Sequence, residues 1–172
     1  MGTGKTTLGR HLAELLSLQF LDLDRLITAR ADMDIPMIFE NRGEAAFRKM
    51  EREALQQVIG EFTGVIALGG GALQNQQVID NIRKNGLLVF IETPISTILE
   101  RIMRNRQRPL LLDDEGRLKS RAVLKAEVEE RYQVRLPRYR QAHLTFKPDK
   151  HDNPEATARK LAQAIRKYVS TH

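Results

Sequence analysis

The sequence predicts an α/β fold in which helices cover both faces of a parallel β-sheet. Segments typical of strands alternate with segments whose apolar residues recur at helical spacing, and this alternation favours a parallel sheet. The stretches 65–68 and 87–91 contain no polar residue, as expected for strands that helices bury on both faces. Short connections and right-handed crossovers then give a three-layer α/β/α domain.

The first half of the chain is predicted to alternate between helices and short strands. A helix is expected to begin at Lys5 or Thr6, because four leucines recur on one face between residues 8 and 16. Pro36 is expected to break a helical stretch, since proline lacks a backbone donor. In order, the expected elements are this first helix, a strand over 19–24, short helices over 26–40, a helix over 43–59 and a strand over 65–68.

The second half continues this alternation around one long polar segment. Gly86 is suited to end a helix, and Pro94 is tolerated in a first helical turn. Residues 106–121 lack apolar periodicity, so we expect a long mobile loop that serves as a lid. In order, the expected elements are a helix over 78–85, a strand over 87–92, helices over 94–105 and 122–135, a strand over 143–147 and a final helix from Pro154.

Composition favours one soluble domain spanning residues 1–172 with an aliphatic core. Apolar residues make up 41% of the chain, tryptophan and cysteine are absent, and the net charge is +6. A chain without cysteine has no disulfide framework and no thiolate metal site. No apolar run approaches the roughly 18 residues of a membrane span, so we expect a cytoplasmic protein without a membrane partner. The basic charge suits an anionic ligand and fits nucleic acid equally well.

The chain opens with GTGKTT, the second half of a phosphate-binding loop. In such loops glycines let backbone N–H groups approach phosphates, the lysine reaches the terminal phosphates and the following hydroxyl binds Mg2+. The complete pattern needs another glycine five residues before Gly4. The alternative is a flexible terminus ahead of a surface helix. The residues expected to contact nucleotide phosphates are Gly2, Thr3, Gly4, Lys5, Thr6 and Thr7.

Two further motifs follow predicted strands. Asp22 and Asp24 lie at the end of the first strand, where ligands of open α/β sheets gather, so one acid could hold Mg2+ and the other a substrate hydroxyl. The alternative is that both only cap the next helix. The triple glycine 69–71 follows the strand 65–68 and could bring backbone N–H groups to an anion, unless it forms a plain turn.

Three arginines stand near these motifs in the expected fold. Arg48 lies on a helix, Arg108 in the expected lid and Arg140 after the helix 122–135. A single arginine is usually solvated surface. A phosphoryl-transfer site with an acidic second substrate needs several cations, however, and arginine holds carboxylates and phosphates bidentately. The four histidines have no metal-ligand spacing.

Six motifs occur in the order and spacing of shikimate kinases: GTGKTTLGRHLA, FLDLD, FRKME, LGGGA, RPLL and PRYRQAH. The chain resembles this family over nearly its whole length. The resemblance implies a P-loop kinase fold of the nucleoside-monophosphate-kinase type. It also implies transfer of the γ-phosphate of ATP to the 3-hydroxyl of shikimate, on the route to chorismate and aromatic amino acids, by a monomer that uses Mg2+.

The resemblance also implies residue roles. On the nucleotide side, it assigns Lys5 and Thr6 to the ATP phosphates and Mg2+, Asp22 to the metal, Arg101 to the adenine and Arg108 to the transferred phosphate. On the shikimate side, it assigns Asp24 to the hydroxyls, as proton acceptor or only as an orienting group, Arg48 and Arg140 to the carboxylate, and Gly70 and Gly71 to backbone contacts. Glu51 matches a supporting acid.

Family members carry a buried strand and a first loop glycine before the position of Met1. The resemblance therefore implies that this chain lacks the central strand of a five-stranded parallel sheet, through a mis-assigned start or a truncation. The apolar burial of a central strand is comparable with the net stability of a domain, roughly 5–15 kcal/mol. We expect weak stability and weak ATP binding for the chain as it stands.

Two other functions fit part of the pattern. Another small-molecule P-loop kinase, such as a gluconate kinase, would share the half-loop and the lid but would not need Arg48, Arg140 and the triple glycine. A nucleotide- or nucleic-acid-binding module would use the basic charge to contact phosphates. The chain lacks a basic stripe interleaved with aromatic residues, so we expect no nucleic-acid partner.

Overall fold

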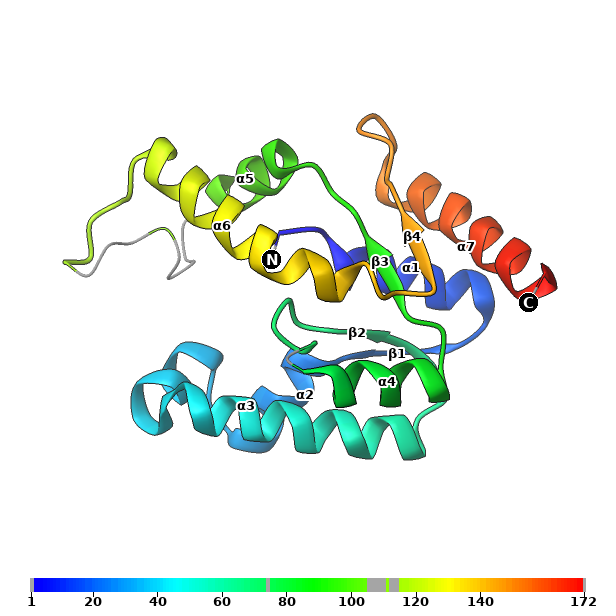
Figure 1. Cartoon of the computed structure of the whole chain (residues 1–172), viewed down its shortest axis with the longest axis horizontal. Coiled ribbons are helices and arrows are strands. Elements are labelled where there is room, and N and C mark those ends of the chain that lie inside the picture. Colours follow the sequence, from blue (N-terminus) through cyan, green and yellow to red (C-terminus); the bar gives the residue numbers. More distant parts are fainter. Residues whose placement is uncertain (1, 74, 105–110, 112–114, 172) are drawn as a thin grey trace.

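The computed structural model describes residues 2–73, 75–104, 111 and 115–171. It has the α/β class that the sequence predicts, with short parallel strands between helices (Figure 1). The elements are, in order, α1 (Lys5–Leu16), β1 (Gln19–Asp22), α2 (Leu23–Ala31), α3 (Ile35–Glu61), β2 (Gly64–Ala67), α4 (Gln76–Asn85), β3 (Val89–Ile91), α5 (Ile95–Arg104), α6 (Arg121–Tyr139), β4 (Leu144–Phe146) and α7 (Pro154–Thr171).

The strands form two separate parallel pairs. β1 pairs with β2, with Gln19 opposite Gly64, and β3 pairs with β4, with Val89 opposite Leu144. The sequence predicted one parallel sheet that lacks its central strand. In the part of the chain that the structure describes, the parallel pairing is as predicted, but the two pairs are not joined into one sheet.

The buried apolar residues fall into three clusters. The first packs α2 against α3 through Leu23, Ile27 and Ile38, and α5 packs against α6 in the second. In the third, Leu12 of α1 meets Leu161 of α7. No helix of the described segments is long and apolar enough to cross a membrane.

Pro36 does not break a helix, contrary to the sequence prediction. It lies in the first turn of α3, where a missing N–H leaves no intrahelical bond unmade. The carboxylate of Asp34 caps this turn by accepting a hydrogen bond from the N–H of Met37 at 2.8 Å. The irregularity falls instead at Gly43, whose φ of 78° lies in the left-handed region and kinks α3.

α6 is longer than predicted and continues through Pro137 to Tyr139. Proline removes a single donor here, and the N–H of Arg140 still bonds the carbonyl of Leu136 at 3.0 Å. Because residues four apart share a helix face, this last turn sets Arg135 and Tyr139 side by side.

The expected lid, residues 106–121, falls largely outside the described residues, which exclude 105–110 and 112–114. Within it, Leu111 is buried against the cluster between α5 and α6. Its carbonyl accepts a hydrogen bond from the N–H of Lys119 at 2.8 Å. The mobility of this segment stays a prediction.

Candidate active site

A cleft of about 590 Å³ opens where β1 and β2 end and α1 begins. Ligands of open α/β sheets bind at this edge, because the loops after parallel strands meet there. The cleft therefore brings together segments that lie far apart in the sequence. Of the site residues predicted from the sequence, those that line it are Gly2, Thr3, Gly4, Lys5, Thr6, Thr7, Asp22, Asp24, Arg48, Gly70, Gly71 and Arg101.

Residues 2–4 form a turn that leads directly into α1, whose first residues are Lys5, Thr6 and Thr7. Gly2 and Gly4 have φ angles of 64° and 83°, a region that glycine adopts without steric cost. The first N–H groups of a helix have no partner within it, so they can bind an anion. Lys5 adds a positive charge, and its Nζ donates to Thr3 Oγ1 at 3.3 Å. This end of the cleft suits phosphate groups.

Arg101 of α5 holds the same turn from outside. Its Nη1 donates to the carbonyl oxygen of Thr3 at 2.8 Å. A methyl group at Gly4 would lie 3.1 Å from that nitrogen, so the guanidinium and the turn are in close approach. Arg101 therefore lies at the nucleotide end of the cleft.

Thr6 and Asp22 meet at the base of the phosphate end. Thr6 Oγ1 donates to Asp22 Oδ2 at 2.7 Å. Asp22 Oδ1 accepts from the N–H groups of Asp24 and Arg25 at 3.1 and 3.3 Å, which caps α2. Asp22 is thus a helix cap, and its second oxygen is turned toward Thr6. The pair offers hydroxyl and carboxylate oxygens, the ligands that Mg2+ prefers alongside phosphate and water.

Asp24 lies in the first turn of α2 and faces the loop after β2. A methyl group at Gly69 would lie 2.6 Å from Asp24 Oδ1, so only glycine fits beside this carboxylate. Burial raises the pKa of Asp24, and the charges of Asp22 and Glu51 raise it further, while Lys5 lowers it. A carboxylate with a raised pKa is a better proton acceptor than an ordinary aspartate.

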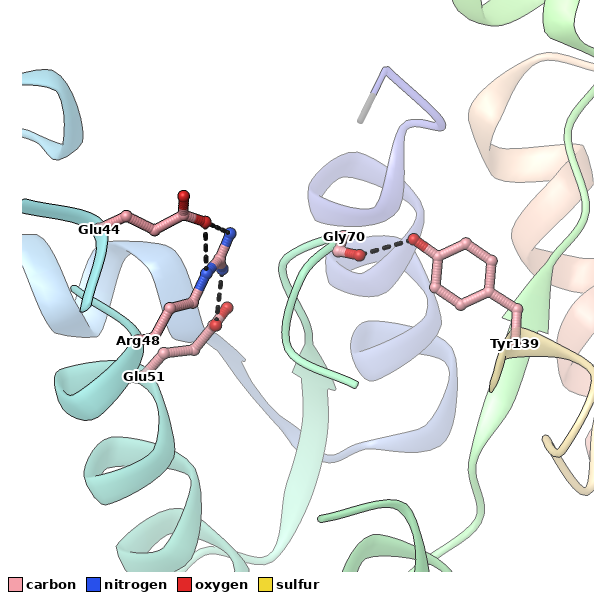
Figure 2. Close-up of polar contacts among 5 residues, drawn as sticks. All are labelled: Glu44, Arg48, Glu51, Gly70 and Tyr139. Atoms are coloured by element: carbon pink, nitrogen blue, oxygen red, sulfur yellow. Dashed lines mark hydrogen bonds and ion pairs between the residues drawn. The ribbon is translucent and has the colours of Figure 1, made fainter. Parts of the chain in front are cut away.

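Two glutamates fix the guanidinium of Arg48 from different directions (Figure 2). Nη1 bonds Oε2 of the buried Glu51 at 2.9 Å, and Nη2 bonds Oε1 of Glu44 at 3.0 Å. The guanidinium also stacks over Phe47, 5.2 Å from the ring centroid. A methyl group at Gly71 would lie 2.5 Å from Nη1, so the triple glycine passes directly beside this cation.

Arg135, which the sequence analysis did not select, lines the cleft, and Arg140 does not. Arg140 is exposed beyond the end of α6, where its charge acts on Tyr132. Arg135 lies at the end of the helix predicted over 122–135, whereas Arg140 follows the last turn of α6, which continues to Tyr139. Arg135 lies eleven residues after the buried Leu124, three helical turns along the same face, and this spacing could have indicated it.

Tyr139 is a second residue that the sequence analysis missed. Its hydroxyl donates to the carbonyl oxygen of Gly70 at 2.6 Å (Figure 2). Its ring stacks on Phe90 with centroids 5.1 Å apart. Burial raises the pKa of Tyr139 more than the nearby Arg135 lowers it, so the hydroxyl stays protonated and can keep donating to Gly70. Tyr139 therefore fixes the glycine loop to the last turn of α6, on the helix face that carries Arg135.

Arg108, predicted to close over the transferred phosphate, lies outside the described residues. Among those described, the cleft is lined by the cations Lys5, Arg48, Arg101 and Arg135 and by the acids Asp22, Asp24 and Glu51. Cations and acids are both required to hold an anionic nucleotide and to orient a hydroxyl nucleophile.

A glycine turn with lysine and threonine at a helix N-terminus, beside parallel strands and an acid-lined cleft, defines a P-loop kinase of the α/β class. A family model described as shikimate kinase matches residues 1–166. The chain belongs to the shikimate kinase family, whose members are ATP-dependent kinases.

Curated relatives and solved structures agree with this family. A shikimate kinase of Chlorobium luteolum is 38% identical over 169 residues, covering 96% of this chain and 84% of the relative. A shikimate kinase of Acinetobacter baumannii is 39% identical over 166 residues, covering 96% of this chain and 85% of the relative. The structure of shikimate kinase from Acinetobacter baumannii in complex with shikimate has a TM-score of 0.81 at 35% identity, over 99% of this chain and 89% of that one. The structure of shikimate kinase from Bacteroides thetaiotaomicron has a TM-score of 0.87 at 30% identity, over 96% of this chain and 94% of that one.

Proposed function

We propose that this chain transfers the γ-phosphate of ATP to the 3-hydroxyl of shikimate, giving shikimate 3-phosphate and ADP. One observation carries the proposal above the others. A single cleft joins a phosphate-binding turn, at Lys5 and Thr6, to two arginines, Arg48 and Arg135, beside the triple glycine. A kinase for a substrate without a carboxylate would not need the second group of cations. The complex of the Acinetobacter baumannii relative with shikimate supports the same substrate.

On the nucleotide side, the backbone of residues 2–7 and Lys5 bind the phosphates of ATP, and Arg101 lies toward the adenine. The Thr6 hydroxyl and Asp22 would hold Mg2+, which neutralises charge on the phosphates when bound. The 2.7 Å approach of these two oxygen groups fits a hard cation. Arg108 would add positive charge over the transferred phosphate, in accordance with the family resemblance.

On the shikimate side, Arg48 and Arg135 bind the carboxylate, because guanidinium groups match it bidentately. Arg135 takes the role that the sequence analysis gave to Arg140. Gly70 and Gly71 bring their backbone close to the ring. Asp24 accepts a hydrogen bond from the 3-hydroxyl and takes up its proton as the oxygen attacks phosphorus, a role that its raised pKa favours.

The remaining lining keeps the reacting groups in place and water away from them. Ile35, Phe39 and Phe47 give the shikimate end of the cleft an apolar wall. Phosphoryl transfer needs little covalent help from protein, so the catalytic contribution is positioning, exclusion of water and neutralisation of charge. A monomer in the cytoplasm remains our prediction for the quaternary state and location.

The direct test is to purify the chain and follow ADP release with ATP, Mg2+ and shikimate. Gluconate and a reaction without acceptor serve as controls. We expect release with shikimate only, and mass spectrometry should find shikimate 3-phosphate. Equal release with gluconate would favour the other class of small-molecule kinase. ADP release without any acceptor would indicate an ATPase and contradict the proposal.

A further inference from the structure

Arg48, one of the two arginines proposed to bind the carboxylate of shikimate, already bonds two carboxylates of its own helix (Figure 2). Its Nε and Nη2 both donate to Oε1 of Glu44, at 3.2 and 3.0 Å, and its Nη1 donates to Oε2 of Glu51 at 2.9 Å. A methyl group at Gly71 would lie 2.5 Å from Nη1 and 2.9 Å from Nη2, so the glycine loop packs against the end of the guanidinium. A carboxylate pairs with arginine through two N–H groups on one edge. Both edges that offer such a pair are therefore occupied.

The two glutamates differ in how firmly they hold this cation. The side chain of Glu51 is 2% exposed, whereas that of Glu44 is 64% exposed. Separating a buried ion pair leaves a charge without compensation in the protein interior, which is strongly unfavourable. Separating an exposed pair costs little, because water solvates both charges. Glu44 is therefore the partner that an incoming ligand can displace.

The charges around Arg48 favour this displacement. One guanidinium carries a single positive charge, and Glu44 and Glu51 already place two carboxylates on it. A ligand carboxylate at the same cation would be the third, and like charges in close contact repel. Glu44 precedes Arg48 by one helical turn, so after release it stays within reach of the guanidinium and can bond it again.

We infer that Glu44 is an internal competitor for the substrate carboxylate. It occupies the Nε–Nη2 edge of Arg48 in the free protein, gives way to the carboxylate of shikimate and returns when the product leaves. The choice of ligand rests on the proposed function, whereas the occupied edge does not. Shikimate 3-phosphate keeps the carboxylate, so Glu44 weakens the binding of substrate and product alike. A ligand without a carboxylate leaves Glu44 in place.

A matched pair of variants on α3 tests the competition. Glu53 is 61% exposed, lies 3.8 Å from Lys49 and does not line the cleft, so Glu44→Gln and Glu53→Gln each remove one negative charge from the same helix. We expect Glu44→Gln to bind shikimate about two- to fivefold tighter in calorimetric titration, as for the loss of an exposed ion pair. Its KM for shikimate should fall, and inhibition by shikimate 3-phosphate should strengthen, by a similar factor. Glu53→Gln should leave all three unchanged.

Two further ligands separate the carboxylate from the rest of shikimate. The methyl ester of shikimate has no charge at this position, so Glu44→Gln and the unmodified chain should bind it equally. Acetate consists of little but the carboxylate and does not require shikimate to be the substrate. In the unmodified chain, we expect shikimate and acetate each to shift the side-chain carboxyl NMR signal of Glu44 in a saturable way. The methyl ester should leave that signal in place, and the signal of Glu53 should not move with any of the three.

Each other outcome has a definite meaning. Equal or weaker binding of shikimate by Glu44→Gln would overturn the inference, and weaker binding would make Glu44 a residue that positions Arg48. Equal tightening by Glu53→Gln, or tighter binding of the methyl ester by Glu44→Gln, would indicate a general effect and overturn it as well. So would a Glu44 signal that neither shikimate nor acetate shifts. If acetate shifts the signal and shikimate does not bind, the competition stands and the proposed substrate is wrong.

Discussion

Asp24 lies half-buried near two other carboxylates, Asp22 and Glu51, and burial raises its pKa above the ordinary value of 3.8. At neutral pH its ionised form is therefore less stable in the folded protein than in the unfolded chain. Its place in the cleft fits the proposed role, since a proton acceptor must be ionised and close to the hydroxyl. Function and stability thus make opposite demands on this side chain.

Asp24→Asn should make the protein more stable and less active. The folded-state pKa is raised, so the wild type loses stability as pH rises from about 3.8 through that higher pKa, and the asparagine variant does not. We expect a higher Tm for the variant at pH 7, equal values at acid pH, and turnover lower by at least about 100-fold. Urea unfolding at several pH values and ADP release measure both. A variant less stable than the wild type at neutral pH would show that the carboxylate stabilises the fold.

Tyr139→Phe tests the link between α6 and the glycine loop. The variant removes the hydroxyl that bonds Gly70 at 2.6 Å and lies near Arg135, and the ring keeps its stacking on Phe90. A neutral hydrogen bond contributes about 0.5–1.5 kcal/mol, so we expect shikimate binding to weaken roughly 3- to 10-fold while ADP binding stays unchanged. Calorimetric titrations check both, with Tyr132→Phe on the same helix as control. Equal weakening of both ligands would mean that the hydroxyl only stabilises the fold.

Asp22, at the beginning of α2, combines a structural role with a chemical one. Asp22 caps the helix through Oδ1 and faces Thr6 through Oδ2. Asparagine caps a helix as well as aspartate but carries no charge. Alanine can neither cap the helix nor carry a charge, and losing the cap costs about 1 kcal/mol of folding stability. Asp22→Asn should therefore unfold like the wild type in urea yet require more Mg2+ for nucleotide binding. Asp22→Ala should lower both the folding stability and the Mg2+-dependent binding of nucleotide. If the asparagine variant binds nucleotide with unchanged Mg2+ dependence, Asp22 is only a cap.

Most elements could be predicted from the sequence, and the errors lie at element ends. Helices such as α1 and α7 have apolar residues at helical spacing, a signal contained within the segment. Pro36 was predicted to break a helix, although a first turn tolerates proline, and α6 continues through Pro137 past its predicted end at residue 135. Tyr139 lies in the four residues of α6 beyond the predicted end, whereas Arg135 lies within the predicted helix and was not selected. The motif residues 2–7, which are adjacent in sequence, all line the cleft, and their contacts with phosphate stay a prediction.

At the scale of the whole molecule, sequence reasoning could not supply the pairing of strands or the contacts between distant segments. The bond from Tyr139 to Gly70 joins residues 69 positions apart, and no local pattern indicates it. The division of the core into three clusters and the cavity between the two strand pairs likewise depend on packing between elements. These features decide how stable the chain is.

The cavity of about 530 Å³ between the two strand pairs predicts weak stability in the absence of ligands. Apolar side chains around a cavity lack packing partners, and residues 89–91 of β3 are all incompletely buried. We expect thermal unfolding below about 55 °C, in the lower half of the usual range for a mesophilic domain. ADP and Mg2+ at 100 times their Kd should add about 2.7 kcal/mol. Circular dichroism with and without nucleotide measures this, and a cooperative midpoint above about 55 °C without ligand would contradict it.

The central claim is that the cations beside the glycine loop bind the carboxylate of shikimate, and calorimetric titration of shikimate tests it most directly. Arg135 lines the cleft and Arg140, five residues later, is exposed outside it, so the two form a matched pair. The account predicts that Arg135→Ala weakens shikimate binding at least about tenfold, as for a lost hydrogen bond to a charged group, and that Arg140→Ala leaves it within about twofold of the wild type. Loss of binding in Arg140→Ala with normal binding in Arg135→Ala would contradict it.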